Sequence, residues 1–161
     1  MTPELERAEW LMRGEALSYS SFIESCLAQI IILAKGSTPT SEGVDFKALH
    51  FKDKVKVAID AIRLVDARIH EENRLFFEEL NHLHFRHRMA HCPIYWDEKD
   101  LSYFTIWEFS LNGKESGPVP VVYSLVEANE EIKRLASICD KLQSILAITA
   151  KDFENKTNYL L

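Results

Sequence analysis

Histidines and arginines are concentrated in one short segment, residues 78–92, which reads EELNHLHFRHRMAHC. Its imidazoles belong to His82, His84, His87 and His91, and its guanidinium groups belong to Arg86 and Arg88. Imidazole exchanges protons near neutral pH, because its ordinary pKa is about 6.5. Guanidinium offers a planar fork of donors that matches the oxygens of a phosphate. Together these residue types suit a site that transfers protons beside a phosphodiester.

The spacing of three of these histidines predicts that they share one side of a helix. His84, His87 and His91 follow the pattern i, i+3, i+7, which forms a stripe at about 100° per residue. The same stripe continues an apolar line formed upstream by Phe76, Leu80 and Leu83. We therefore expect imidazoles at positions where a helix usually buries aliphatic side chains.

Each of these residues also has a structural interpretation. An imidazole that faces a helical bundle is commonly a hydrogen-bonded core residue, which is the alternative for His84. His82 is expected on the surface. Arg86 and His91 would suit either phosphate chemistry or a polar network at a dimer interface. A further alternative is a metal site on this one helix, with ligands from His84, His87, His91 and either Glu78 or Glu79.

Composition restricts the class of protein. The chain has 161 residues, of which 47% are hydrophobic and 27% charged, as in an ordinary soluble domain. Its net charge of −6 argues against a general nucleic-acid coat protein, which would be basic. A local basic site is still compatible with that charge. We expect a single domain over residues 1–161.

The cysteines and the N-terminal residues indicate a cytoplasmic location. Cys26, Cys92 and Cys139 are odd in number and form no CxxC pair, which favours a reducing compartment. The chain starts with acidic rather than basic residues, unlike a signal peptide. The apolar run Cys26–Ala34 is interrupted by Gln29 and is too short to span a bilayer. We therefore expect no membrane partner.

Helical periodicity dominates the chain before Pro93. It predicts three helical regions. The first covers residues 3–35 as one bent helix or two, the second begins between Asp45 and Asp53, and the third covers residues 73–91. Residues 36–45 (GSTPTSEGVD) have the composition of a loop, and the polar stretch at residues 70–74 predicts a break. Because Pro93 restricts the residue before it, the last of these helices should end at His91 or Cys92.

The period changes from 3.6 to 2 after Pro93, which predicts a β-hairpin around residues 103–123. Its strands cover residues 103–111 and 119–123, with a turn at Asn112-Gly113. Pro120 confines the second strand to an edge of the sheet. Ser124 and Glu127 then form a capping box for a long final helix. The predicted fold is mainly α, a bundle of four to five helices with one inserted hairpin.

Residues 86–91, RHRMAH, resemble the signature of the HEPN superfamily. These are small α-helical bundle proteins, and many are metal-independent ribonucleases of prokaryotic toxin and antiphage systems. The family pattern is Arg, a polar residue, a few variable residues and His, often as Arg-Asn-Arg-x-Ala-His-Gly. Here Arg86, Arg88, Ala90 and His91 match that form, and His87 is a permitted replacement of the Asn. Cys92 departs from it by replacing the Gly.

The resemblance implies a metal-independent endoribonuclease, or an RNA- or nucleotide-binding remnant of one. In that role Arg86 would stabilise phosphate, His91 would act as general acid or base, and His87 would orient either group. Arg88 and His84 would contact the substrate, with no metal or other cofactor. The family forms dimers in which two motifs meet across a two-fold axis, so a homodimer is expected, with an antitoxin or another protein as a possible partner.

The alternative function is a non-enzymatic module that uses the His/Arg stripe structurally, for homodimerisation or for docking a partner. The net acidity favours this alternative, because an RNase usually has a wider basic rim than this chain provides. The two functions make opposite predictions for substitutions of His91 and Arg86.

Overall fold

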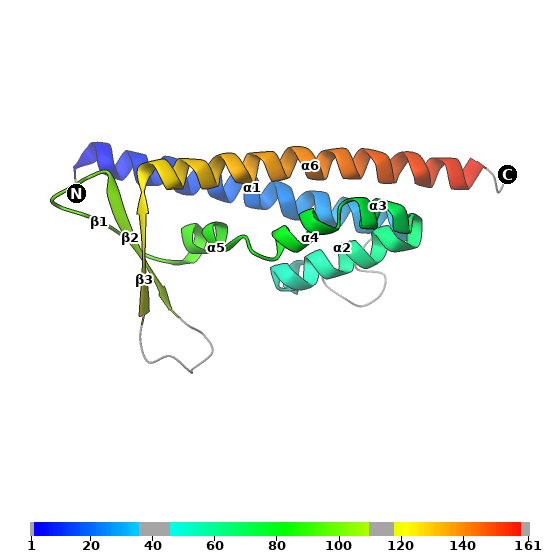
Figure 1. The fold of residues 1–161 in the computed structure, drawn as a ribbon, viewed down its shortest axis with the longest axis horizontal. Coiled ribbons are helices and arrows are strands. Elements are labelled where there is room, and N and C mark those ends of the chain that lie inside the picture. Colours follow the sequence, from blue (N-terminus) through cyan, green and yellow to red (C-terminus); the bar gives the residue numbers. More distant parts are fainter. Residues whose placement is uncertain (1, 36–45, 110–117, 159–161) are drawn as a thin grey trace. The chain divides into compact units, whose positions relative to one another are not determined.

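The computed structural model describes residues 2–35, 46–109 and 118–158 of the chain (Figure 1). The fold is mainly α with a small antiparallel β-sheet, so the predicted fold class is confirmed. Its helices are α1 (Pro3–Lys35), the short 3₁₀ helix η2 (Phe46–Ala48), α2 (Phe51–Val65), α3 (Ala67–Glu72), α4 (Arg74–Leu80), α5 (His84–His91) and α6 (Leu125–Asn158). Its strands are β1 (Ile94–Trp96), β2 (Tyr103–Phe109) and β3 (Pro118–Ser124).

Several predicted boundaries are confirmed. α1 is one continuous helix over the predicted residues 3–35, and α5 ends at His91. The predicted break near residues 70–74 occurs at Asn73, between α3 and α4. The predicted loop at residues 36–45 and the hairpin turn at residues 112–113 lie outside the described residues.

The single helix predicted over residues 73–91 is wrong, because the chain leaves the helix between α4 and α5. The N–H of Asn81 bonds to the carbonyl of Glu78, and the N–H of His82 bonds to the carbonyl of Glu79. These are i→i+3 bonds, which tighten and end an α-helix. α5 therefore begins with a new rotation about its axis. His84, His87 and His91 still lie on one helix, but they no longer continue the apolar line formed by Phe76, Leu80 and Leu83.

The chain divides into two compact units. One consists of Met1–Ser20 and His84–Ser137, and the other consists of Ser21–Leu83 and Ile138–Leu161. Both α1 and α6 contribute to each unit. The break before α5 falls at the boundary between the units, and α5 belongs with the sheet and with the N-terminal part of α1.

The second unit, Ser21–Leu83 and Ile138–Leu161, has a purely helical core. Its largest fully buried side chains are Ile23, Leu27, Ile30, Ile31, Ile62, Phe77, Leu80 and Leu142. They come from α1, α2, α4 and α6, and each full burial of such a side chain contributes about 1.5–3 kcal/mol. Lys54 of α2 is buried beside this core and bonds to Glu24 of α1 at 2.6 Å.

The unit that contains α5 is built around the sheet, whose strand order is β1-β2-β3 (Figure 1). The predicted hairpin is confirmed as β2 and β3, whereas β1 was not predicted. Phe104 and Ile106 of β2 are fully buried and form the inner face of the sheet. The predicted capping box is also present, because Glu127 N–H donates to Ser124 Oγ and Ser124 N–H donates to the Glu127 carboxylate.

One helix among the described residues, α1, is long and apolar enough to cross a membrane by length and composition. Of the 18-residue stretch of α1 that meets this test, 39% is buried inside the fold. A core helix of a soluble protein passes the same test, so this feature is weak evidence of a membrane span. The cytoplasmic location expected from the sequence stays a prediction.

Candidate functional site on helix α5

Helix α5 buries a different side from the one that the sequence predicts. Phe85 and Met89 face the core, and Cys92 is buried directly after the helix. The histidines of the predicted stripe, His84, His87 and His91, are all exposed. The expectation that imidazoles replace core aliphatic residues is therefore wrong, and its cause is the break at residues 81–83. These three side chains instead reach the surface of the protein.

His87 and His91 lie against each other on this exposed side. The centroids of their rings are 4.9 Å apart, and the ring planes are tilted by 53°. This contact follows from the i, i+4 spacing, which places both side chains on one side of consecutive turns. The structure therefore brings together two of the three residues predicted to be catalytic.

The surroundings of His87 lower its pKa below the ordinary value of 6.5. Partial desolvation of the ring is the largest cause, and the positive charges of His91, Arg86 and Arg88 act in the same direction, whereas Glu108 opposes them. A neighbouring cation disfavours a second positive charge, just as desolvation does. His87 is therefore more completely neutral at physiological pH than a free histidine.

Arg86 precedes this pair on the same helix and is half-buried. Its positive charge contributes to the lowered pKa of His87, so the guanidinium acts electrostatically at the imidazole pair. His82, which the sequence places on the surface, is exposed. His84 lies in the first turn of α5, at the end of the helix away from His91.

Arg88 connects α5 to the sheet. Its guanidinium donates to the Glu108 carboxylate of β2 at 3.0 Å and to the hydroxyl of Tyr123 in β3 at 2.7 Å. Desolvation acts to lower the pKa of Arg88, but the bonds to Tyr123 and Glu108 outweigh it and raise the pKa. These bonds occupy donors that a substrate would need, so the predicted substrate-binding role of Arg88 stays a prediction.

The end of α5 is held by Arg13, a residue of α1 that the sequence does not single out. Its guanidinium donates to the carbonyl of Met89 and, at 3.0 Å, to the carbonyl of Cys92. Carbonyls at a helix C-terminus lack partners within the helix, so a side-chain donor stabilises that end. Glu9, one turn before Arg13, accepts from its Nε at 2.9 Å and orients it. Arg13 thereby fixes the turn that carries His91.

No local pattern in the sequence indicates this role. The two carbonyls accepting from Arg13 lie 76 and 79 residues further along the chain. Arg13 and Glu9 form an i, i+4 ion pair, which is common on solvated helix faces. Only the tertiary fold distinguishes this pair from an ordinary surface pair.

A metal site on α5 finds no support in the geometry. Across residues 2–35, 46–109 and 118–158, no three His, Cys, Asp or Glu side chains are grouped so that they could hold a metal ion. Of the histidines that would have supplied ligands, His87 and His91 lie in contact with each other. Because those two rings touch each other, a common ion would need further ligands that these ranges do not provide.

Comparison of the chain with protein-family models, with curated proteins and with solved structures gives no match. The resemblance to the HEPN superfamily therefore stays a prediction that rests on residues 86–91.

Proposed function

We propose that the exposed side of α5 binds RNA and cleaves it without a metal ion, in the manner of a HEPN-like endoribonuclease. The observation that carries this proposal is the solvent-exposed contact between His87 and His91, with the charge of Arg86 acting on it. Two neighbouring imidazoles can serve as acceptor and donor of protons in one reaction. Arg86 supplies positive charge for the phosphate oxygens.

The chemistry is an attack by the RNA on itself. An imidazole accepts the proton of a 2′-hydroxyl while its oxygen forms a bond to the adjacent phosphorus. The bond from phosphorus to the 5′-oxygen then breaks, and an imidazolium gives that oxygen a proton. The products are a 2′,3′-cyclic phosphate and a free 5′-hydroxyl. The lowered pKa of His87 suits it to be the acceptor, and His91 is then the donor.

In this proposal the protein works in the cytoplasm as a homodimer, in which two α5 helices combine into one RNA-binding surface. A second copy would add another Arg86 and another His pair, and so offset the small basic area of one chain and its net charge of −6. A toxin or defence role, with an antitoxin as partner, belongs to the same proposal and rests on the resemblance alone.

A single cleavage assay tests the proposed function. The full chain is incubated with single-stranded RNA of mixed sequence in buffer containing EDTA, and the products are separated on a denaturing gel. We expect fragments that end in a 2′,3′-cyclic phosphate. The DNA strand of the same sequence should stay intact, because it lacks the attacking hydroxyl. Cleavage that requires an added divalent ion, or equal cleavage of the DNA, would contradict the proposal.

The lowered pKa of His87 predicts the pH dependence of cleavage. If His87 accepts the proton, activity is lost when this ring is protonated, which happens only below pH 6.5 because the pKa is lowered from that value. We therefore expect the acidic limb of kcat/KM to have its midpoint below pH 6.5. Initial rates between about pH 5 and pH 8, the range in which histidine usually changes charge, measure this limb.

An NMR titration of the His87 ring provides the matching control. Its midpoint should coincide with the acidic limb, and it should rise toward 6.5 in His91→Ala, which removes the second-largest cause of the lowered pKa. A rate profile whose midpoint lies above 6.5 would show that another group accepts the proton.

The alternative function, a non-enzymatic interaction module, is favoured by one observation. Arg88 belongs to the same segment, and its bonds to Glu108 and Tyr123 are structural. If the other His and Arg residues of α5 are structural as well, the exposed imidazoles bind a protein surface or a second copy of the chain. The substitutions described in the Discussion separate this function from catalysis.

A further inference from the structure

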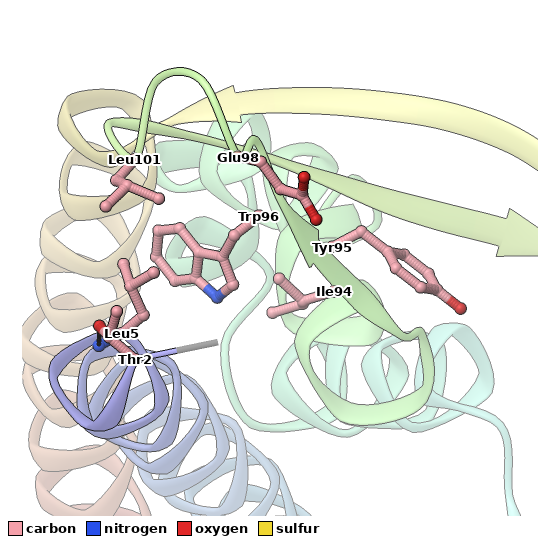
Figure 2. Close-up of a pocket in the computed structure, with 7 residues that line it drawn as sticks. All are labelled: Thr2, Leu5, Ile94, Tyr95, Trp96, Glu98 and Leu101. Atoms are coloured by element: carbon pink, nitrogen blue, oxygen red, sulfur yellow. Dashed lines mark hydrogen bonds between the residues drawn. The ribbon is translucent and has the colours of Figure 1, made fainter.

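A groove of about 590 Å³ lies in the same unit, between the start of α1 and strand β1 (Figure 2). Its aliphatic wall consists of Leu5, Ile94 and Leu101, and the indole of Trp96 lies in the middle of the lining. Volumes of roughly 300–1,000 Å³ are typical of sites that hold small molecules. None of the described residues that line the groove belongs to α5, so the groove is separate from the exposed side of that helix.

The indole in this groove is held in place. Trp96 Nε1 donates to the Glu9 carboxylate at 3.3 Å, and Trp96 packs against Phe104 with ring centroids 5.2 Å apart. A fixed indole is the strongest aromatic partner for an organic cation. Tyr95, the neighbouring residue of β1, is also among the lining residues, but its ring points away from the indole (Figure 2).

The charge of the lining has one sign. Glu98 contributes a carboxylate to the groove, and no Lys, Arg or His is among the described residues that line it. Glu98 also makes no ion pair or hydrogen bond through its side chain with another described residue. Among the described residues, therefore, no side chain neutralises this carboxylate. An apolar wall, the indole of Trp96 and the carboxylate of Glu98 together suit a molecule with an apolar body and a positive end.

We propose that this groove binds a small organic ammonium ion, with the apolar body of the ligand against Leu5, Leu101 and Trp96 and the ammonium group near Glu98. The charge of Glu98 disfavours an anionic ligand, and a neutral ligand would gain nothing from that carboxylate. The proposal is independent of the RNA chemistry on α5, so either can fail without the other.

Isothermal titration of the full chain with three matched compounds tests the ligand class. The probes are 2-phenylethylammonium, neutral 2-phenylethanol and anionic 3-phenylpropanoate, which share one aromatic body. We expect the ammonium ion to bind up to about fivefold more tightly than the alcohol, as one favourable charge contact near solvent allows. The anion should bind more weakly than the alcohol. Equal affinities for the three probes, or no binding of the ammonium ion, would overturn the proposal.

Two variants assign the charge contact. Glu98→Gln should remove the preference for the ammonium ion over the alcohol while leaving the affinity for the alcohol unchanged. Glu130→Gln removes one exposed carboxylate from α6 outside the groove and should change nothing. A preference for the ammonium ion that survives in Glu98→Gln, or is lost in Glu130→Gln, would show that overall charge and not this groove is responsible.

Discussion

Replacing His91 with Ala is expected to reduce RNA cleavage by about a hundred- to ten-thousand-fold, the usual loss when a positioned acid or base is removed. The expected effect on stability is small. His91 is exposed and ends its helix, and surface substitutions of this kind usually change the free energy of unfolding by less than about 0.5 kcal/mol. Single-turnover cleavage and thermal unfolding of the same preparation measure the two effects.

His82→Ala is the matched control for this substitution. It removes an exposed imidazole from the turn before α5, outside the His87–His91 contact, and should leave the cleavage rate unchanged. Two other outcomes for His91→Ala would favour the interaction module: a melting temperature lower by many degrees, or a dimer that dissociates in light scattering. In either case the wild-type chain would cleave no RNA.

Replacing Arg86 with Ala should lower cleavage about as strongly, by roughly a hundred- to a thousand-fold, because the charge that stabilises the transition state is lost. Arg86→Lys should restore only part of the rate, since an ammonium group cannot reproduce the two parallel bonds of a guanidinium to phosphate. The fall should appear in kcat more than in KM if Arg86 acts mainly in the transition state. Steady-state rates over a range of RNA concentrations separate the two constants.

Arg88→Ala is an informative comparison, because the two arginines are two positions apart. Arg88 bonds to Glu108 and Tyr123, so its loss should lower the stability of the fold and leave two polar partners unsatisfied. If Arg86 serves phosphate, as proposed, Arg86→Ala should lower cleavage more than it lowers the stability of the fold. If Arg86→Ala unfolds the protein more readily than Arg88→Ala does, then Arg86 is structural and the assignment to phosphate is wrong.

The periodicity of the sequence predicts most elements because it reports local geometry. The alternation after Tyr103 predicts β2 and β3, and Ser124 with Glu127 predicts where α6 begins. The helix C-terminus at His91 follows from Pro93, whose ring restricts the preceding residue. Each of these signals acts over a few residues, so it can be recognised without the tertiary fold.

The orientation of α5 could not be predicted, because it depends on a short interruption with no Gly or Pro to mark it. Residues 81–83 read Asn-His-Leu, which are compatible with a helix, yet the N–H groups of Asn81 and His82 adopt i→i+3 bonds there. That change moves the histidines from the expected buried stripe to the surface. Sequence spacing did predict the contact of His87 with His91, because both lie within one uninterrupted helix.

Contacts between residues far apart in the sequence could not be predicted from local patterns either. β1 is only three residues long and is recognised as a strand through its pairing with β2. Arg13 reaches carbonyls more than seventy residues away, as its separations of 76 and 79 show. Neither feature has a periodic signal. Both depend on the packing of α1 and the sheet within their unit.

The guanidinium of Arg13 has an electrostatic consequence for a phosphate at the His pair. The aligned peptide dipoles of a helix leave about half a negative charge at its C-terminus, which repels anions, and His87 and His91 lie in the last two turns of α5. Arg13 brings a positive charge, partly balanced by its ion pair with Glu9, to two carbonyls at that end, Met89 and Cys92. The repulsion between this helix end and an anionic ligand is thereby reduced.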